Sequence, residues 1–302
     1  PGDETAWTYP PYGDGAGVVN EGKVFGLGAS DMKASLASFL GVMDRYVKSP
    51  PPVDLFFSFV TEEETSGDGS RNYVRYFQSE HRSRYEEVGA VVGEPTDLQY
   101  IEIGNRGTYF YDVEVSGVSC HAAQAASKKT NAPEILLQVL RDVDVRLEEW
   151  KKKYAHDLLG LPAVTVTRLW TSESSPNQVP GKAKARWDIR TTPELHSMIE
   201  SELNEVISDR GKLHLITTPC VSAVADKECH LVRSILLAHP GLDLRAARGA
   251  NDTGEFLAEG IPAVTYGPGQ KAVIHGVNES VEVSYLNKSV DCYAAIVEHF
   301  SK

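Results

Sequence analysis

Hydrophobic and polar residues along the first hundred positions follow a pattern that predicts strands alternating with helices. Val53 to Val60 is an apolar run with three phenylalanines, typical of a buried strand. A helix is expected after Asp31, because apolar residues recur there every three or four positions, at Leu36, Phe39, Leu40, Met43 and Val47. The other predicted elements are a strand at 23–28, a helix at 70–79 and a strand at 90–92. This alternation favours an α/β fold with a mostly parallel sheet flanked by helices.

The pattern changes after residue 105. Residues 108–115 alternate with period two, as in an antiparallel strand with one exposed face. The elements expected after it are a helix at 132–154, strands at 162–170 and 183–189, a helix at 194–207 and a strand at 212–217. This β-α-β-β-α-β order predicts a ferredoxin-like α+β domain inserted into the chain.

Beyond about residue 221 the α/β pattern returns. A helix is expected near 228–238, a strand at 263–266 and a last helix from about residue 284. The sequence therefore predicts a discontinuous first domain, residues 1–105 and 221–302, interrupted by an inserted domain of residues 106–220.

Composition and charge narrow the classes of function. The chain has 302 residues, which is long enough for two domains, and its net charge of −12 argues against a nucleic-acid partner. No apolar run approaches the ~20 residues that a membrane span needs. The four cysteines form no Cys-x-x-Cys pair, so free thiols in a reducing cytoplasm are the simplest account. We therefore expect a cytoplasmic protein that acts on a small molecule.

Acidic residues gather at one rim of the predicted sheet. Asp31 precedes the first helix, Glu63 and Glu64 follow an apolar strand-like run, and Glu94 follows the next strand. Ligands of open α/β sheets bind at such a rim, and acids placed there repel one another unless a cation lies among them. Each acid also has a simpler interpretation: a helix N-cap for Asp31, a solvated loop for the glutamate run, and an exposed turn for Glu94.

Eight short motifs occur along the chain in the order seen in one family. They are Gly26 to Lys33, Thr61 to Ser66, Gly93 to Thr96, Arg106-Gly107, Gly117 to His121, Asn177 with Pro180, Asp188-Ile189-Arg190, and Gly267-Pro268-Gly269 followed by His275 to Glu279. Together they resemble the acetylornithine deacetylase / succinyl-diaminopimelate desuccinylase family of co-catalytic zinc metallopeptidases.

The resemblance implies a dinuclear zinc site. Asp31 would bridge two Zn²⁺ ions, for which Co²⁺ or Mn²⁺ are substitutes, and Glu64, Glu94 and His275 would supply further ligands. Glu63 would be the general base that activates the shared water. The chemistry agrees with this division, because neighbouring glutamates at a strand end point differently and one can face the metals while the other faces the water. For His275 the simpler interpretation is a surface-loop histidine.

For the inserted domain the resemblance implies substrate contacts and assembly. His121 would stabilise the oxyanion in the site of a partner subunit, and Asn177 and Arg190 would bind the substrate carboxylate, which suits the bidentate guanidinium of arginine. The alternatives are a loop histidine for His121 and an ion pair with Asp188 for Arg190. The chain is expected to form a homodimer through this domain.

Two departures from the family pattern stand out. The family's first metal motif, a His-x-Asp pair, is expected just upstream of Pro1, so the N-terminal part of the catalytic domain would be missing, and fewer than two zinc ions are expected if the chain begins at Pro1. The stretch Asn251 to Glu255 lacks the arginine that the family often has close after the aspartate. This second departure leaves the substrate open.

The sequence therefore predicts a zinc-dependent hydrolase that cleaves the amide of an N-acyl amino acid or short peptide. Its glutamate-rich motif leans toward acetylornithine deacetylase. Two alternatives stay open: a dipeptidase or carboxypeptidase of the same family, and a non-catalytic dimeric binding protein that has lost the metal site.

Overall fold

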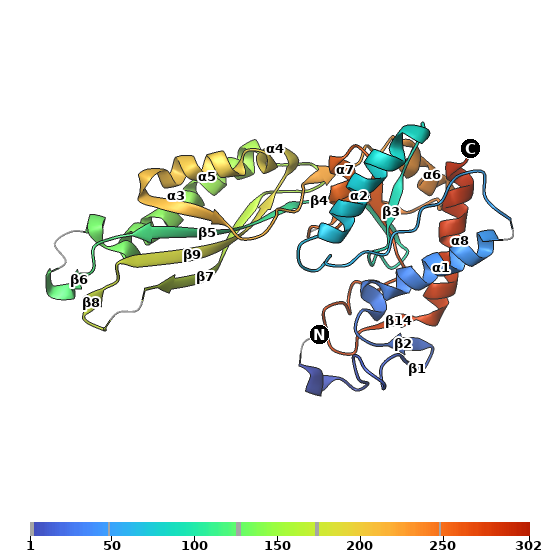
Figure 1. Cartoon of the computed structure of the whole chain (residues 1–302), viewed down its shortest axis with the longest axis horizontal. Coiled ribbons are helices and arrows are strands. Elements are labelled where there is room, and N and C mark those ends of the chain that lie inside the picture. Colours follow the sequence, from blue (N-terminus) through green and yellow to red (C-terminus); the bar gives the residue numbers. More distant parts are fainter. Residues whose placement is uncertain (1–2, 48, 125–127, 173–174, 248) are drawn as a thin grey trace. The chain divides into compact units, whose positions relative to one another are not determined.

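The computed structural model describes residues 3–47, 49–124, 128–172, 175–247 and 249–302, and the chain divides into two compact units (Figure 1). The first unit comprises Pro1–Gly104, Val224–Ala246 and Glu255–Lys302, and the second Asn105–Ala223 and Ala247–Gly254. No helix in the described residues is long and apolar enough to cross a membrane. The sequence predicted a division at 105 and 221; the compact second unit also takes in residues 247–254.

The first unit contains a mixed sheet of short strands. Its path is β11 (Ala223–Val224), β4 (Tyr100–Asn105), β13 (Ala263–Thr265) and β3 (Ala90–Val92), with β12 (Asp243–Ala247) paired to β4. β13 runs parallel to β3 and antiparallel to β4. The expected mostly parallel sheet is thus mixed, because the seven residues between β3 and β4 are too few for the crossover that a parallel return requires.

A second, antiparallel sheet in the same unit joins distant parts of the chain. β1 (Val18–Asn20) pairs with β2 (Lys23–Phe25), and β2 pairs with β14 (Ser280–Glu282). This pairing brings the end of the chain to the segment that begins at residue 26. The helices of the unit are α1 (Ala34–Val47), α2 (Asp68–Glu80), α6 (His230–Ala238), α7 (Thr253–Ala258) and α8 (Val283–Phe300), with short turns η1 (Glu4–Ala6), η2 (Ala29–Lys33) and η3 (Arg82–Arg84).

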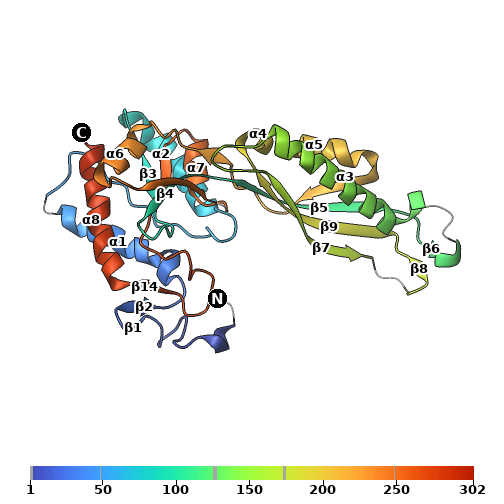
Figure 2. The same ribbon diagram turned by 180° about the vertical axis from the view of Figure 1, so that it is seen from behind.

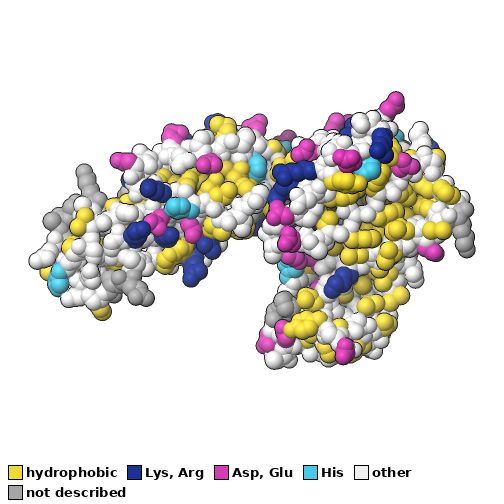
Figure 3. All heavy atoms as spheres, in the orientation of Figure 1, with side chains coloured by type: hydrophobic (Ala, Val, Ile, Leu, Met, Phe, Trp, Pro, Cys, Tyr) yellow, Lys and Arg dark blue, Asp and Glu magenta, His cyan; other side chains and the backbone are white. Residues whose placement is uncertain are grey.

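Helix α1 packs on α8 through small residues and only part of the predicted apolar stripe. Ser38 contacts Ser289 of α8 through their hydroxyls at 2.5 Å, and Gly41 lies against Val290. In the predicted stripe, Phe39 packs on Tyr293 of α8 at 4.8 Å, whereas Leu40 and Val47 are 55% and 73% exposed. Small residues let α1 and α8 approach closely, and both views show the two helices side by side (Figure 2). Figure 3 shows hydrophobic side chains gathered on this side of the unit.

The prediction of a strand at 53–60 is wrong. These residues lie outside every strand of the described chain, and Phe56 and Phe59 are 43% and 46% exposed. Phe56 packs edge-on against Phe77 of α2 and Tyr85. An extended apolar run becomes a strand only where a neighbouring strand takes up its backbone hydrogen bonds, and the described residues supply no such partner here.

The second unit is one antiparallel sheet covered on one face by helices. The strand order is β10 (Gly211–Leu215), β5 (Gly107–Ser116), β9 (Lys182–Thr191) and β7 (Ala163–Thr171). Helices α3 (Ala132–Lys153) and α5 (Ile199–Ile207) cover one face, as both views show. The remaining elements are β6 (Cys120–His121), β8 (Gln178–Val179), α4 (Pro193–His196), η4 (Ala122–Gln124), η5 (Lys128–Thr130) and η6 (Ser208–Arg210). The chain order of the main elements is the β-α-β-β-α-β order that the sequence predicts.

The two faces of this sheet differ as the period-two alternation requires. Every second residue of β9, including Ala185, Trp187 and Ile189, is buried under α3 and α5. The opposite face carries ion pairs between neighbouring strands, among them Arg186 with Asp112 at 2.8 Å. On that face, hydrogen bonds from Lys182 and then Lys184 hold the pKa of Glu114 at about 2.

His196 gives the second unit a pH-dependent contribution to stability. Its ring packs on Tyr109 at 4.8 Å, its Nδ1 lies 2.8 Å from the Thr191 hydroxyl, and burial lowers its pKa from 6.5 to about 4. Between these two pH values the unfolded chain binds a proton that the folded chain does not. The free energy of unfolding should therefore fall as the pH is lowered through this window.

This is checked by denaturant unfolding at pH 7, 5.5 and 4 for the parent and His196→Gln. The parent should lose more stability than His196→Gln between pH 7 and pH 4. His214→Gln, a change at an exposed position of β10, should follow the parent. Parallel curves for the parent and His196→Gln would contradict the expectation.

Candidate metal centre

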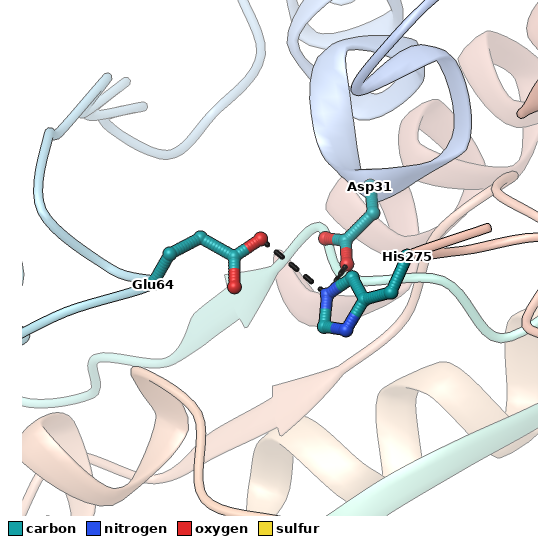
Figure 4. Close-up of side chains that lie close together, drawn as sticks. All are labelled: Asp31, Glu64 and His275. Carbon is teal, nitrogen blue, oxygen red and sulfur yellow. Dashed lines mark ion pairs between the residues drawn. The ribbon is translucent and has the colours of Figure 1, made fainter. Parts of the chain in front are cut away.

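Three side chains from separate segments of the first unit converge at one point. Nε2 of His275 lies 3.1 Å from Oδ2 of Asp31 and 3.5 Å from Oε1 of Glu64. One donor atom from each of the three residues lies within 4.8 Å of the other two, and Figure 4 shows the side chains pointing toward one another. The sequence predicted all three as metal ligands, and the structure brings them together.

Asp31 is held by an irregular turn. It lies in η2, where its φ of −117° and ψ of 89° depart from helical values, and its side chain is only 11% exposed. The turn starts at Gly28, which has a left-handed φ of 75°. The backbone N–H of Asp31 donates to the buried carboxylate of Glu279 at 2.8 Å. The carboxylate of Asp31 is therefore presented by backbone that the rest of the unit fixes.

Glu64 lies in a tight acidic turn. The carbonyl oxygen of Glu62 accepts hydrogen bonds from three successive backbone N–H groups, those of residues 65, 66 and 67. Glu62 itself has a left-handed φ of 68°, which is uncommon for a residue with a side chain. The turn leaves the Glu64 side chain 63% exposed, whereas Glu63 is half-buried. The two neighbours thus have different surroundings, as their predicted division of roles requires.

Arg71 fixes the turn that carries Glu64 through hydrogen bonds and ion pairs. Nη2 of Arg71 donates to the carbonyl of Ser66 at 3.3 Å, and Nη1 donates to Asp68 at 2.5 Å. Nε and Nη2 of Arg71 also grip both oxygens of Glu255, at 3.1 and 2.9 Å. Because the side chains of Arg71 and Glu255 are only 11% and 10% exposed, this pair fixes the turn more firmly than a surface ion pair would.

His275 lies in the loop between β13 and β14, which is tied to the rest of the unit. Lys271 pairs with the buried Glu102 of β4 at 2.7 Å, and the N–H of Gln270 donates to the hydroxyl of Ser30 at 3.0 Å. His275 and Asn278 both have left-handed φ values, 58° and 57°. Left-handed φ values in residues other than glycine are found preferentially at functional sites, where surrounding contacts hold the strained backbone.

Glu94, the fourth predicted ligand, is not in this group. It is half-buried just after β3, in the same unit, and none of its carboxylate atoms meets the distance that unites the other three. Its backbone is pressed against the His275 loop, because a Cβ at Gly267 would lie only 2.4 Å from the carbonyl of Gly93 and 2.6 Å from that of Glu94. Gly267 is thus required for this close approach.

The donor set suits zinc. Zinc bonds of about 2.0–2.1 Å to nitrogen and oxygen, arranged tetrahedrally, place neighbouring ligand atoms about 3.3 Å apart. The two separations from His275, 3.1 and 3.5 Å, lie on either side of this value. One imidazole and two carboxylates would leave a fourth position open, as catalytic zinc sites do.

Two of the predicted substrate-contacting residues lie together in the second unit. Nδ2 of Asn177 is 3.1 Å from Nε2 of His121, and both side chains are exposed. The contact is built by the pairing of β6 with β8, in which His121 faces Gln178, and by a hydrogen bond from Ala122 N to Asn177 O at 2.7 Å. The structure therefore brings these two residues into one cluster.

Arg190 lies elsewhere in the same unit. Its Nε and Nη2 donate to the two oxygens of Asp188, at 2.7 and 2.9 Å, and its Nη1 donates to Thr108. The alternative interpretation, a pair with Asp188, is thus what the structure contains. Arg190 lies within β9, next to its last residue, whereas the β6–β8 pair lies beyond the other end of β9, and the eight steps from Lys182 to Arg190 span about 26 Å.

The sequence matches one family model along nearly its whole length. The model described as peptidase family M20/M25/M40 matches residues 1–299. The chain belongs to this family. Among curated relatives, the succinyl-diaminopimelate desuccinylase of Paracoccus denitrificans (strain Pd 1222) is 27% identical over 99% of this chain and 80% of its own length.

Solved structures of other proteins share the fold. The aminopeptidase PepT of Bacillus cereus matches 94% of this chain and 76% of its own with a TM-score of 0.73 at 16% identity. The YXEP protein of Bacillus subtilis, described as a dinuclear metal binding peptidase from the M20 family, matches 89% and 72% with a TM-score of 0.65 at 14% identity. At these identities the likeness concerns the α/β fold alone.

One residue of the site had no role in the sequence-based interpretation. Glu279 is part of the motif that begins at His275, but only the structure shows that it is buried and bound to the Asp31 turn. In the sequence, Glu279 is a charged residue directly before the short strand β14, and this position gives no sign of its burial.

Substitution of the three converging residues tests whether they bind one metal ion together. The parent protein should bind Zn²⁺, and Asp31→Asn, Glu64→Gln and His275→Gln should each weaken binding at least about tenfold, because each removes one donor of a three-donor set. Competition with a chromophoric chelator measures the dissociation constants. Glu228→Gln and His214→Gln change exposed residues outside the group and should bind like the parent. Equal affinity in all six proteins would contradict the assignment.

Proposed function

We propose that this M20 chain is a metal-dependent hydrolase that cleaves the amide bond of an N-acyl amino acid or short peptide with a free carboxylate. The convergence of Asp31, Glu64 and His275 is the observation that carries the proposal. Three exposed or half-buried polar groups from distant segments gain little from meeting unless a cation joins them. In a peptidase family, such a cation points to hydrolysis.

We infer one Zn²⁺ at these three residues and a second shared between Asp31 and Glu94, with Co²⁺ or Mn²⁺ as substitutes. Bound zinc would acidify a water molecule and polarise the scissile carbonyl. Glu63, next to the ligand Glu64 and half-buried, would accept a proton from the attacking water and deliver it to the leaving amine. The amide C–N bond breaks, and the products are a carboxylate and an amine.

The His121–Asn177 cluster of the second unit would supply hydrogen-bond donors to the substrate. An imidazole N–H and an amide NH₂ that already lie 3.1 Å apart can both reach one oxyanion or carboxylate. Arg190 would reach a substrate carboxylate only by exchanging part of its contact with Asp188. Because Arg190 lies at one end of β9 and this cluster beyond the other end, one small substrate would meet both only if two copies of the second unit contribute.

A homodimer through the second unit would provide those two copies. Strand β7 is an edge of its sheet, and Val166 and Leu169 on it are 40% and 56% exposed. An unpaired edge with apolar side chains favours pairing with another chain. The sheet face with its paired charges adds little long-range repulsion between two copies.

The substrate class separates the deacylase from the close alternative, a dipeptidase or carboxypeptidase. The Paracoccus denitrificans relative is named a succinyl-diaminopimelate desuccinylase, whereas PepT is described as an aminopeptidase. Turnover of N-acetyl and N-succinyl amino acids beside dipeptides and tripeptides would decide between them. A zinc-loaded protein that turns over none of these would favour the non-catalytic binding protein.

The roles of Glu63 and Glu64 are tested by matched substitutions. Glu63→Gln removes a proton acceptor but no ligand, so it should keep the parental zinc content and lose about 10²- to 10⁴-fold in kcat. Glu64→Gln should lose both zinc affinity and turnover. Metal analysis and steady-state kinetics on the same preparations measure the two effects.

Glu62→Gln is the control for this pair, because it makes the same change in the neighbouring exposed residue, whose backbone carbonyl builds the turn. It should keep zinc and most of the turnover. The reverse pattern, zinc lost in Glu63→Gln and kept in Glu64→Gln, would mean that the two roles are exchanged.

Assembly is tested by mixing subunits. His121→Ala and Glu63→Gln should each be nearly inactive alone. Co-expressed in equal amounts, they should recover about a quarter of the parental activity, because half of the dimers are mixed and one of their two sites has both groups intact. Failure to recover activity in dimers shown to be mixed would mean that His121 does not act in a partner's site.

A further inference from the structure

Glu279 is a fully buried carboxylate that serves the backbone. Its side chain is among the largest that solvent does not reach, and the residue is 1% exposed. Its Oε2 accepts a hydrogen bond from the N–H of Gly28 at 2.8 Å, and its Oε1 accepts from the N–H groups of Ser30 and Asp31 at 2.9 and 2.8 Å. Three backbone donors therefore surround one acid.

This arrangement compensates a charge that would otherwise be costly to bury. An isolated ionised carboxylate loses its hydration in the interior and is tolerated only where hydrogen bonds or a counter-charge replace it. No ion pair that the described residues form includes Glu279. The left-handed conformation of Gly28 instead helps to turn the N–H groups of residues 28, 30 and 31 toward one point, which makes an anion-binding concavity.

The hydrogen bonds of Glu279 connect the segment that carries Asp31 with the segment that carries His275. One donor is the backbone of Asp31 itself, so the carboxylate of Glu279 sets the path of the chain from which that ligand projects. Glu279 also lies four residues after His275, and its own carbonyl accepts from Gly26 N at 3.0 Å. A shift at Glu279 would therefore move both ligands relative to each other.

A second link runs parallel to the first. Ser30, which is inaccessible to solvent, donates from its hydroxyl to the carbonyl of Ser280 at 2.7 Å and accepts from the N–H of Gln270 at 3.0 Å. It joins the Asp31 turn to both sides of the His275 loop without a charge. The carboxylate of Glu279 and the hydroxyl of Ser30 thus both connect the Asp31 turn to the His275 loop.

We propose that Glu279 is a positioning residue of the metal centre. It holds Asp31 and His275 at the separation that a cation needs, and it does so through the backbone without contributing a ligand. This inference rests on the proposed metal-dependent function. Groups that orient metal ligands in this way typically change metal affinity by about 10- to 100-fold when they are altered.

The test is the zinc affinity of Glu279→Gln in the whole chain. The substitution keeps the size of the side chain but removes its charge and turns an NH₂ group toward backbone donors. The dissociation constant for Zn²⁺, measured by chelator competition where circular dichroism shows full folding, should rise about 10- to 100-fold. A merely structural residue would lower the melting temperature of the metal-free protein and leave this constant unchanged.

Glu282→Gln is the matched control, because it makes the same change three residues on, where the side chain is 31% exposed and pairs with Lys23. It should bind zinc like the parent. If Glu279→Gln does not fold, Glu279→Asp decides, because it keeps the charge but draws the carboxylate back from the three N–H groups, and it should weaken zinc binding about tenfold. A folded Glu279→Gln, or failing that a folded Glu279→Asp, with parental zinc affinity would overturn the inference. A parent protein that binds no zinc would overturn the proposed function instead.

Discussion

Repulsion between like charges is the constraint on which the first unit depends. The fold compensates several buried carboxylates around the site: Arg71 pairs with Glu255, Lys271 with Glu102, and backbone N–H groups surround Glu279. For the carboxylates of Asp31 and Glu64, the ion pairs that the structure describes are with His275. These two carboxylates therefore lie close enough to share a cation, and the two loops and the turn that carry the ligands are each held by compensated neighbours.

The second unit shows how much of a fold periodicity alone can predict. Its helices and strands are long, and their predicted bounds lie within a few residues of the observed ones, as for β5 and α3. Strict alternation in β9 leaves one register, because a shift by one residue would expose Trp187 and Ile189. The chief difference is the predicted helix at 194–207, which divides into α4 and α5.

The first unit was harder to predict because its outcome depends on partners. The run 53–60 has the composition of a strand, but composition does not supply the neighbour that a strand needs. The exposed stripe of α1 was misjudged for a similar reason, since serine and glycine contacts with α8 decide its orientation. In the site, the family motifs located Asp31, Glu64 and His275, although residues 53–60 do not form the strand expected before Glu64. No pattern in the sequence could show that the neighbouring Glu279 is buried, because burial arises from the pairing of β14 with β2.

The motifs of this chain contain residues that are required for packing, such as Gly267, and residues that the proposed chemistry requires, such as Glu63. The glycine is required because the chain passes within contact distance of Gly93 and Glu94, so any side chain there would force the loops apart. That demand is steric and concerns packing alone. A descendant of this protein that had lost its chemistry, yet still folded, would keep Gly267 while Glu63 drifted freely. Retention of the glycine-rich part of the pattern therefore traces ancestry, whereas retention of the acidic part traces selection for activity.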